Sequence, residues 1–301
     1  MTRRTAIASL GALAAPALGR GATPMPPICI FSKHLSKIEY TELGAIAKEL
    51  GFDGVDLTVR PGGHVNPYLV SVDLVRAIES IRGAGIDVPM ITTALTSPND
   101  PTARPILALA GRSKVPYFKM GYWKYGSADD VQAQDLQAKL AVVRRDVFGL
   151  SAIGRQYGIA AGFHNHSGDN VGEAVWDIQS IIADMDPRWI GYYFDPCHAT
   201  AEGGVEGWNI SLRLALPRLK MVAVKDFYWA KTGGKWSMQM CPLGEGMVNW
   251  QKFFSTIARG GFSGPISLHL EYNPKDELNA IRRDLEFARK QIHAAYGGGV
   301  S

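Results

Sequence analysis

The sequence has 301 residues, of which 46% are hydrophobic and 20% charged, ordinary values for a globular protein that exclude a disordered or fibrous chain. The formal net charge of +4 comes largely from the first 22 residues, which contain three arginines and no acidic residue. The rest of the chain carries 29 basic side chains (32 minus 3) and 28 acidic ones, without a basic run, so we expect no nucleic-acid partner.

Residues 1–22 have the composition of an export signal. Arg3 and Arg4 form a short basic start, the apolar run from Ala6 to Leu18 follows, and prolines come soon after it. The adjacent arginines predict the twin-arginine type of signal and a periplasmic or otherwise exported protein. Because the apolar run is too short to cross a bilayer, we expect no stable membrane span. The three cysteines are too few, and odd in number, for a disulfide framework.

Residues 23–301 predict one domain in which strands and helices alternate. Strands are expected at 28–31, 55–59, 87–92, 116–120, 159–164, 190–195, 221–226 and 266–271, and helices at 39–50, 70–84, 104–112, 131–157, 173–183, 209–216, 249–259 and 276–294. Eight such units without a linker favour an α/β fold of the (β/α)8 TIM barrel type. A doubly wound sheet is disfavoured because residues 31–34 are not a glycine-rich phosphate turn. The longest insertion, about 227–243, has Gly233 and Gly234 at its centre and predicts a hairpin.

Polar side chains follow six of the predicted strands. In chain order they are Arg60 and His64, Lys119, His164 and His166, Asp195 and His198, Lys225, and His269 and Glu271. The carboxyl ends of barrel strands meet at one face, where the active sites of TIM barrels lie. We therefore expect these side chains to form a site for a small molecule.

The two-residue period of strands selects the side chains that point into the barrel. Glu271 shares a face with His269, Asp195 with Tyr193, and Lys225 with Ala223. His164, Asp195 and Glu271 are a suitable set of ligands for a divalent cation such as Mn²⁺, Mg²⁺ or Zn²⁺. Such an ion would stabilise an enediolate while a nearby carboxylate or lysine moves the proton.

Several strings together resemble the sugar phosphate isomerase/epimerase family with its xylose-isomerase-like barrel. They are Phe163-His164-Asn165-His166-Ser167-Gly168, Asp195-x-x-His198, Val224-Lys225-Asp226-Phe227, Pro242-Leu243-Gly244-Glu245-Gly246 and Ser267-Leu268-His269-Leu270-Glu271-Tyr272. The resemblance runs through nearly the whole chain after residue 22. It implies a TIM barrel, a divalent metal ion and reversible proton transfer on aldoses or ketoses.

The resemblance also implies a ligand set from which this chain departs. Family members hold the metal ion with Glu, Asp, His and Glu on strands five to eight, and Asp195 and Glu271 match the second and fourth of these. His164 stands where the first Glu is expected, and Ala223 replaces the strand-seven His. His198 matches a histidine that contacts the substrate in the family. It is also a candidate for completing a shifted metal shell.

The missing glutamate bears on catalysis. Epimerases of the family exchange the proton between two glutamates, of which only Glu271 remains, so Lys225 or His164 becomes the candidate for the second base. A salt bridge to a neighbouring carboxylate is the alternative role for Lys225. Substrate contacts are expected from the other polar strand ends and from one aromatic side chain of the insertion: Arg60, His64, Lys119, His166, His198, His269 and Trp229.

Three functions remain open on the sequence alone. The first is an isomerase or epimerase of an unphosphorylated sugar or keto-sugar, since phosphorylated sugars are mostly cytoplasmic. The second is a lyase or dehydratase that eliminates a β-substituent from a keto-sugar or 3-keto-glycoside, and the third is a carbohydrate-binding barrel without catalysis. A three-zinc nuclease is disfavoured because the strand ends hold too few ligands. Self-association into a homo-oligomer is also left open.

Overall fold

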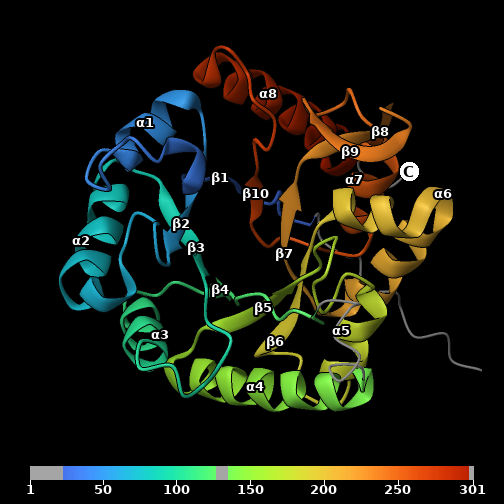
Figure 1. Ribbon diagram of the computed structural model, residues 1–301. Helices are drawn as coiled ribbons and strands as arrows, with labels where there is room; N and C mark the ends of the chain where they lie inside the picture. Colours follow the sequence, from blue (N-terminus) through green and yellow to red (C-terminus); the bar gives the residue numbers. More distant parts are fainter. Residues whose placement is uncertain (1–22, 127–134, 298–301) are drawn as a thin grey trace, which may run out of the picture.

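The computed structural model describes residues 23–126 and 135–297 (Figure 1). The expected signal, residues 1–22, lies outside the described residues, as do the first four residues of the expected helix 131–157. Within the described part, eight parallel strands close into a barrel in the order β1-β10-β7-β6-β5-β4-β3-β2. The predicted single-domain (β/α)8 TIM barrel is therefore confirmed.

The barrel strands are short and mostly buried. They are β1 (Ile28–Phe31), β2 (Gly54–Val59), β3 (Asp87–Thr93), β4 (Tyr117–Lys119), β5 (Ala160–His164), β6 (Ile190–Phe194), β7 (Leu219–Val224) and β10 (Ile266–Leu268). The surrounding helices are α1 (Leu43–Leu50), α2 (Val70–Gly83), α3 (Ala103–Arg112), α4 (Leu136–Tyr157), α5 (Val175–Ile182), α6 (Pro196–Ala215), α7 (Trp250–Arg259) and α8 (Glu277–Tyr296). Short 3₁₀ helices in the described part of the chain occupy Ser32–Leu35, Pro67–Leu69 and Leu216–Arg218.

Local sequence signals set several helix ends. The side chains of Asp135, Asn249 and Asp276 each accept a hydrogen bond from a backbone N–H in the first turn of α4, α7 and α8, respectively. Such caps satisfy N–H groups that have no partner inside the helix. Gly158 ends α4 in the left-handed conformation with φ of 74°, which glycine adopts without steric cost.

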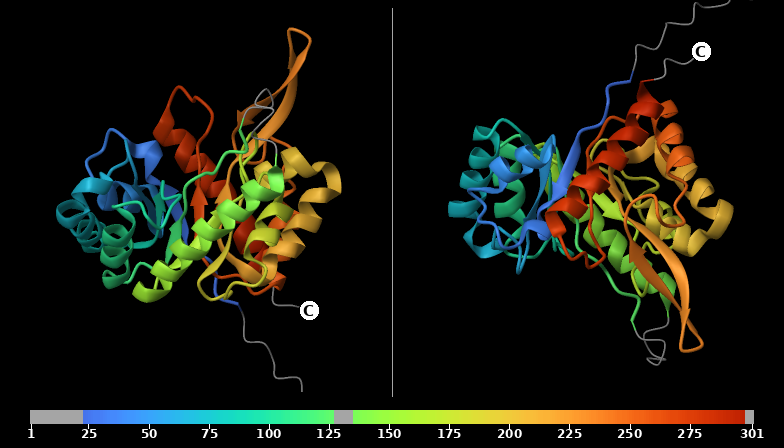
Figure 2. Two further views of the ribbon diagram at one scale, coloured as in Figure 1. Left: turned by 60° about the horizontal axis from the view of Figure 1, so that its bottom comes forward. Right: turned by 90° about the horizontal axis from the view of Figure 1, so that it is seen from above.

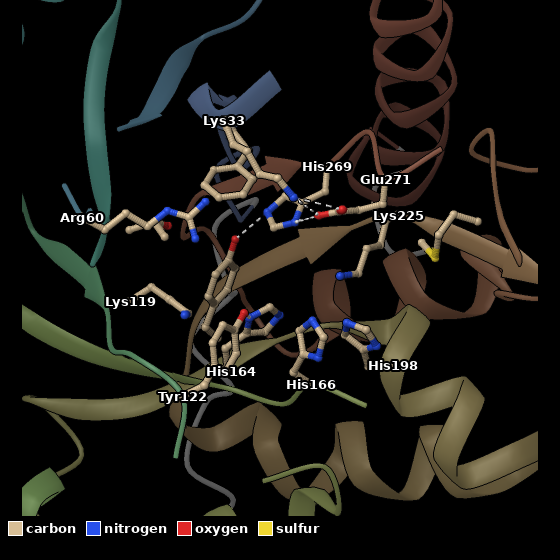
Figure 3. Close-up of a pocket in the computed structure, with 14 residues that line it drawn as sticks. Lys33, Arg60, Lys119, Tyr122, His164, His166, His198, Lys225, His269 and Glu271 are labelled. Carbon is tan, nitrogen blue, oxygen red and sulfur yellow. Dashed lines mark hydrogen bonds and ion pairs between the residues drawn. The ribbon is translucent and has the colours of Figure 1, made fainter. Parts of the chain in front are cut away.

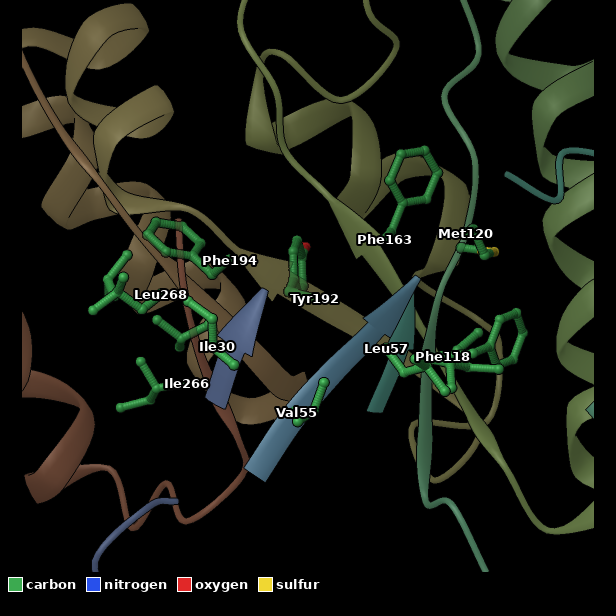
Figure 4. Close-up of a cluster of buried hydrophobic side chains, with 14 of the residues drawn as sticks. Ile30, Val55, Leu57, Phe118, Met120, Phe163, Tyr192, Phe194, Ile266 and Leu268 are labelled. Carbon is green, nitrogen blue, oxygen red and sulfur yellow. The ribbon is translucent and has the colours of Figure 1, made fainter. Parts of the chain in front are cut away.

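Alternate residues of the barrel strands face in opposite directions. Outward-facing side chains such as Ile30, Leu57 and Phe118 belong to the large apolar layer beneath the helices (Figure 4). Inward-facing Met90, Tyr193, Met221 and Ala223 form a second, small apolar cluster. Each barrel strand therefore supplies side chains to two environments, the outer core and the barrel interior.

An antiparallel hairpin interrupts the barrel pattern after β7. It consists of β8 (Asp226–Thr232) and β9 (Lys235–Cys241), joined by Gly233 and Gly234, both at positive φ. Figure 2 shows the hairpin projecting well beyond the barrel. Its cross-strand pairs run from Asp226 opposite Cys241 to Thr232 opposite Lys235.

Several predicted elements differ in extent from the structure, and two of them bear on the site. The predicted helix 209–216 is only the end of α6, which starts at Pro196, directly after β6. Gly203, Gly204 and Gly207 conceal this helix in the sequence, and Gly204 has a non-helical φ of 61° that kinks it. The predicted strand 266–271 pairs as a strand only over Ile266–Leu268. Among the described residues, no helix is both long and apolar enough to cross a membrane.

Candidate active site

A cavity of about 300 Å³ opens at the carboxyl ends of the barrel strands (Figure 3). Its lining side chains come from the strand ends, from the loops after them and from the hairpin. They are Phe31, Lys33, Arg60, Thr92, Lys119, Tyr122, His164, His166, Tyr193, His198, Lys225, Met240, His269 and Glu271. The predicted site face therefore carries a cavity of a size that suits a small sugar.

Asp195 follows β6 and is fully buried beside this cavity. Its Oδ1 accepts hydrogen bonds from the backbone N–H groups of Cys197 (2.9 Å) and His198 (3.1 Å), which caps α6. Its Oδ2 faces three nitrogen atoms: Lys225 Nζ at 3.2 Å, His164 Nε2 at 3.3 Å and His198 Nε2 at 3.7 Å. One carboxylate oxygen thus caps helix α6, while the other lies close to three side-chain nitrogen atoms.

The orientation of this cluster is set by a second group of hydrogen bonds. The Nδ1 atom of His164 lies 2.8 Å from the hydroxyl of Tyr122, and that of His198 lies 2.9 Å from Ser167 Oγ. Asn165 donates to the backbone carbonyl of Asp195 at 2.9 Å and accepts from its N–H at 2.8 Å. These contacts leave the Nε2 atoms of both histidines directed toward Asp195.

Lys225 carries its charge into the cavity. Burial is the largest single cause and lowers the pKa of Lys225, but the negative charges around it, with Asp195 first, together outweigh burial and raise the pKa above its ordinary value. A lysine that keeps its proton donates hydrogen bonds and does not act as a base. Of the two roles considered from the sequence, the salt bridge is the one that the geometry shows.

Glu271 follows β10, the strand next to β7, and has a different partner from the cluster around Asp195. Its two carboxylate oxygens lie 3.3 and 3.1 Å from Lys33 Nζ, and His269 Nδ1 lies 4.0 Å from Oε1. Although burial raises it, the charges of Lys225 and Lys33 lower the pKa of Glu271. The side chain keeps 27% of its surface exposed, so the ionised carboxylate faces the cavity.

Lys119, the last residue of β4, points into the cavity from another wall (Figure 3). It is 3% exposed, its Nζ lies 3.4 Å from the centre of the Tyr122 ring, and it forms no ion pair with any described carboxylate. Burial, followed by the charge of Arg60, lowers the pKa of Lys119 well below its ordinary value. Since β4 and β10 are four places apart in the closed order of eight strands, Lys119 and Glu271 stand on opposite walls.

The floor of the cavity holds a buried carboxylate. Asp56 of β2 accepts hydrogen bonds from Thr92 Oγ1 (2.7 Å) and Ser267 Oγ (2.7 Å). Burial raises the pKa of Asp56 to about 6, and the hydrogen bonds only partly offset this. Beside Asp56, Met90 and Tyr193 belong to the apolar cluster that contains Ala223, the residue at the position where the family resemblance implies a histidine.

Two predicted substrate contacts lie away from the cavity lining. His64 has both ring nitrogens engaged, Nδ1 with Thr58 Oγ1 and Nε2 with the carbonyls of Leu35 and Ile38, all at 3.1 Å. These bonds hold the loop after β2, which is a structural role. Trp229 lies on β8, is 41% exposed and packs edge-on against Phe227. The other predicted residues, Arg60, Lys119, His164, His166, His198, Lys225, His269 and Glu271, line the cavity, and Asp195 lies behind it.

The donors do not fit a divalent metal ion. Among the described residues, no group of three His, Cys, Asp or Glu side chains is arranged to hold one. Asp195 and His164 come together as predicted, but Lys225 Nζ lies against the Asp195 oxygen that a cation would need. The third predicted ligand, Glu271, is bound by Lys33 instead. The predicted ligand set of His164, Asp195 and Glu271 is therefore not assembled.

Some cavity residues were given no role on the basis of the sequence. Lys33 and Tyr122 come soon after β1 and β4, where polar side chains of the site are expected. Tyr193 points inward two residues before Asp195, and its hydroxyl lies 3.0 Å from His269 Nε2. Met240 comes from the returning strand of the hairpin, and no sequence signal places it at the cavity.

Comparisons with known proteins agree with this fold. A structure of a xylose isomerase-like TIM barrel protein from Mycobacterium smegmatis in complex with magnesium matches with a TM-score of 0.70 and 17% identity, over 90% of this chain and 97% of that one. The 3-keto-D-glucoside 4-epimerase of E. coli matches with a TM-score of 0.71 and 14% identity, over 88% and 99% of the two chains. The D-allulose 3-epimerase of Methylomonas sp. in complex with D-allulose matches with a TM-score of 0.65 and 14% identity, over 90% of this chain and 99% of that one.

A search of curated proteins by sequence found no match. The model of one protein family, described as xylose isomerase-like TIM barrel, matches residues 45–291, which is most of the chain. The order of strand-end motifs, the closed barrel and this match agree. The chain belongs to the xylose isomerase-like TIM barrel family.

Proposed function

We propose that the protein is an epimerase or isomerase that moves a proton on a carbon next to the carbonyl group of an unphosphorylated sugar or keto-sugar. The observation that carries the proposal is the placement of two proton-accepting groups, Glu271 and Lys119, on opposite walls of one cavity. Such a pair can remove a proton from one face of a planar enediolate and return one to the other face. The epimerases among the structurally similar proteins support the same reaction class.

Glu271 is suited to the first wall because it is ionised and reaches the cavity. Lys33 holds both of its oxygens, which fixes the carboxylate in one orientation. Lys119 is suited to the second wall because a buried lysine without a carboxylate partner loses its proton readily. One wall therefore offers a carboxylate and the other a lysine whose pKa burial lowers.

The negative charge that develops on the carbonyl oxygen needs a donor between these walls. Lys225 provides an ammonium group at the end of β7, next to β10 in the barrel order. A fixed positive charge in a site with little water stabilises an enediolate more strongly than it would in bulk water. Proton removal and charge stabilisation thus come from different strands, as in other barrel enzymes.

Export of the protein, which we also propose, favours an unphosphorylated substrate. The composition of residues 1–22 supports export, and phosphorylated sugars are mostly cytoplasmic. Cell fractionation tests export: we expect the protein in the periplasmic fraction. A variant in which Arg3 and Arg4 are both replaced by lysine serves as the control. Retention of the wild-type protein in the cytoplasm would remove this argument for a free sugar.

Incubation with ketoses and with a 3-keto-glycoside in D₂O, followed by NMR, tests the reaction. We expect deuterium at the carbon next to the carbonyl of an otherwise intact sugar, together with the epimer or isomer. Release of the aglycone would instead show the lyase reaction, which needs only one base. Absence of both exchange and release across the panel would favour a binding protein.

Two variants separate the roles of the two walls. Lys119→Met and Glu271→Gln should each lower the rate of epimerisation by roughly 100-fold or more, the usual contribution of general acid–base catalysis. Each variant should still exchange deuterium into the substrate epimer whose proton faces the remaining base. Undiminished epimerisation in the Lys119→Met protein would exclude the two-wall mechanism.

A further inference from the structure

The ammonium group of Lys225 stands where a bound cation would be expected in this site. Lys225 follows β7, is 3% exposed, and places Nζ 3.2 Å from Asp195 Oδ2. His164 and His198 direct their Nε2 atoms toward the same oxygen, at 3.3 and 3.7 Å. One carboxylate oxygen and two imidazole nitrogens thus converge beside a single positive charge.

The two histidines have the features of metal ligands in every respect except the metal ion. Their Nδ1 atoms are held by Tyr122 and Ser167, an arrangement that orients imidazole ligands in metal sites. Within the described part of the chain, His198 Nε2 is buried and has no hydrogen-bond partner. Two nitrogens and one carboxylate oxygen form a donor set that suits Zn²⁺ or Co²⁺.

Lys225 prevents these donors from binding a divalent cation. Asp195 Oδ2 is in contact with the ammonium group, and Oδ1 is occupied by the two N–H groups at the start of α6. A second cation beside Oδ2 would lie against a buried positive charge that is screened very little. Among the described residues of the wild-type chain, no group of three His, Cys, Asp or Glu side chains is arranged to hold a metal ion.

We propose that Lys225 is a built-in cation that replaces a divalent metal ion in this site, and that removing its side chain exposes a His164–Asp195–His198 site for Zn²⁺ or Co²⁺. The role of the ammonium group toward the sugar oxygen rests on the proposed function. The exclusion of a divalent cation does not, because it follows from the contacts of Asp195 alone.

Metal binding without any sugar tests the inference. CoCl₂ is titrated into the wild-type protein, into Lys225→Ala and into a control, Lys119→Ala. The control removes the side chain of another buried lysine of the same cavity. Binding is followed by calorimetry and by the visible absorption of Co²⁺. We expect one Co²⁺ per chain in Lys225→Ala, with d–d bands of a low-coordinate site, and no stoichiometric binding in wild type or Lys119→Ala.

A double variant tests whether the gained site has the proposed ligands. Adding Asp195→Asn to Lys225→Ala should weaken Co²⁺ binding by roughly 100-fold, because the only carboxylate ligand is lost. Circular dichroism confirms folding, and Lys225→Ser carries the same expectation if the alanine variant does not fold. Stoichiometric binding by wild type, or a folded Lys225→Ala protein that binds no more tightly than wild type, would overturn the inference.

The result is separable from the sugar reaction. If deuterium exchange is found, its rate in wild type should be unchanged after dialysis against EDTA, whereas a loss that added metal restores would contradict the built-in cation. If no sugar reacts, the proposed function fails. The difference in Co²⁺ binding between wild type and Lys225→Ala still tests the inference about Lys225, because that measurement involves no sugar.

Discussion

Two buried aspartates at neighbouring strand ends, Asp195 after β6 and Asp226 after β7, have opposite surroundings. Both are 0% exposed. Asp226 accepts hydrogen bonds from N–H groups only: the backbone of Phe227 (2.9 Å), Gly244 (3.0 Å), Gly246 (3.3 Å) and Val248 (3.2 Å), and Trp250 Nε1 (2.8 Å). Asp195 gives one oxygen to such N–H groups and the other to charged and titratable side chains.

The difference shows that burial does not distinguish a structural carboxylate from a functional one, whereas the kind of partner does. Asp226 ties the loop before α7 to the base of the hairpin, and Gly246 lies so close to it that a Cβ atom would clash with Oδ1. Its hydrogen bonds are complete within the protein. Asp195 holds Lys225, whose ammonium group still faces the cavity.

Asp226→Ala should have the largest effect, and the effect should be on stability. Several buried N–H groups would lose their acceptor, which we expect to lower the free energy of unfolding by about 3 to 5 kcal/mol. Urea denaturation measures the change, with Asp184→Ala, at a side chain that is 67% exposed, as the control. A loss no larger than that of the control would mean that the loop does not depend on Asp226.

Asp195→Asn should instead act mainly on the sugar reaction. The amide oxygen can still cap α6, but Lys225 loses its carboxylate partner and its fixed position. Displacement of a catalytic group by about 1 Å commonly costs on the order of 100-fold in rate, so we expect a loss of at least that size. The rate of deuterium exchange and the midpoint of urea denaturation are each measured for Asp195→Asn and for the wild-type protein. A stability loss as large as that of Asp226→Ala, with normal exchange, would reverse the assignment of the two aspartates.

Two buried histidines on the Glu271 side of the cavity, His269 and His34, should make stability depend on pH. Burial is the first cause that lowers the pKa of His269 well below its ordinary value, and that of His34 to about 4. A pKa below the unfolded value contributes stability above about pH 6.5 that is lost as the pH falls toward the folded pKa. His269→Gln should therefore reduce the loss of unfolding free energy between pH 7.5 and 5.5 by about 1 kcal/mol, as measured by urea denaturation.

Asp56→Asn provides a control of the opposite sign. Because burial raises the pKa of Asp56 to about 6, its protonation adds stability as the pH falls through that value. Asp56→Asn should therefore increase the loss of unfolding free energy between pH 7.5 and 5.5, whereas His269→Gln should reduce that loss. Shifts of the same sign in both variants would contradict the assignment.

The smallest effect is expected from Trp229→Ala. The side chain lies on the hairpin outside the cavity lining, and exposed substitutions usually change free energies by no more than about 0.5 kcal/mol. The KM for the sugar should therefore change by less than about twofold. A tenfold rise would mean that the hairpin folds over the bound sugar and that Trp229 stacks on it, as first expected from the sequence.

Most of the fold could be predicted because its signals are local. Alternation of buried strands with amphipathic helices is visible in the sequence, and so is the glycine pair that turns the hairpin. The start of α6 was missed because three glycines obscure its helical pattern, although Asp195 and Pro196 form an ordinary helix start. Local patterns are weakest where one residue both caps a helix and serves a site.

The position of the site could be predicted from the sequence, but the contacts between its side chains were less predictable. Lys119 was expected only as a substrate contact, because its opposition to Glu271 depends on the order of strands around the closed barrel. His64 looked like a site residue because it follows β2, but its ring binds the backbone carbonyls of Leu35 and Ile38. Neither fact can be found from spacing along the chain.

The sequence by itself determined the barrel, its polar mouth and the departure from the family's ligands at His164 and Ala223. Only the tertiary structure decided that Asp195 pairs with Lys225 and Glu271 with Lys33, leaving Lys119 without a carboxylate partner among residues 23–126 and 135–297. The reason is physical: side-chain direction along a strand follows from a two-residue period, whereas the pairing of charges across a barrel depends on closure, register and burial.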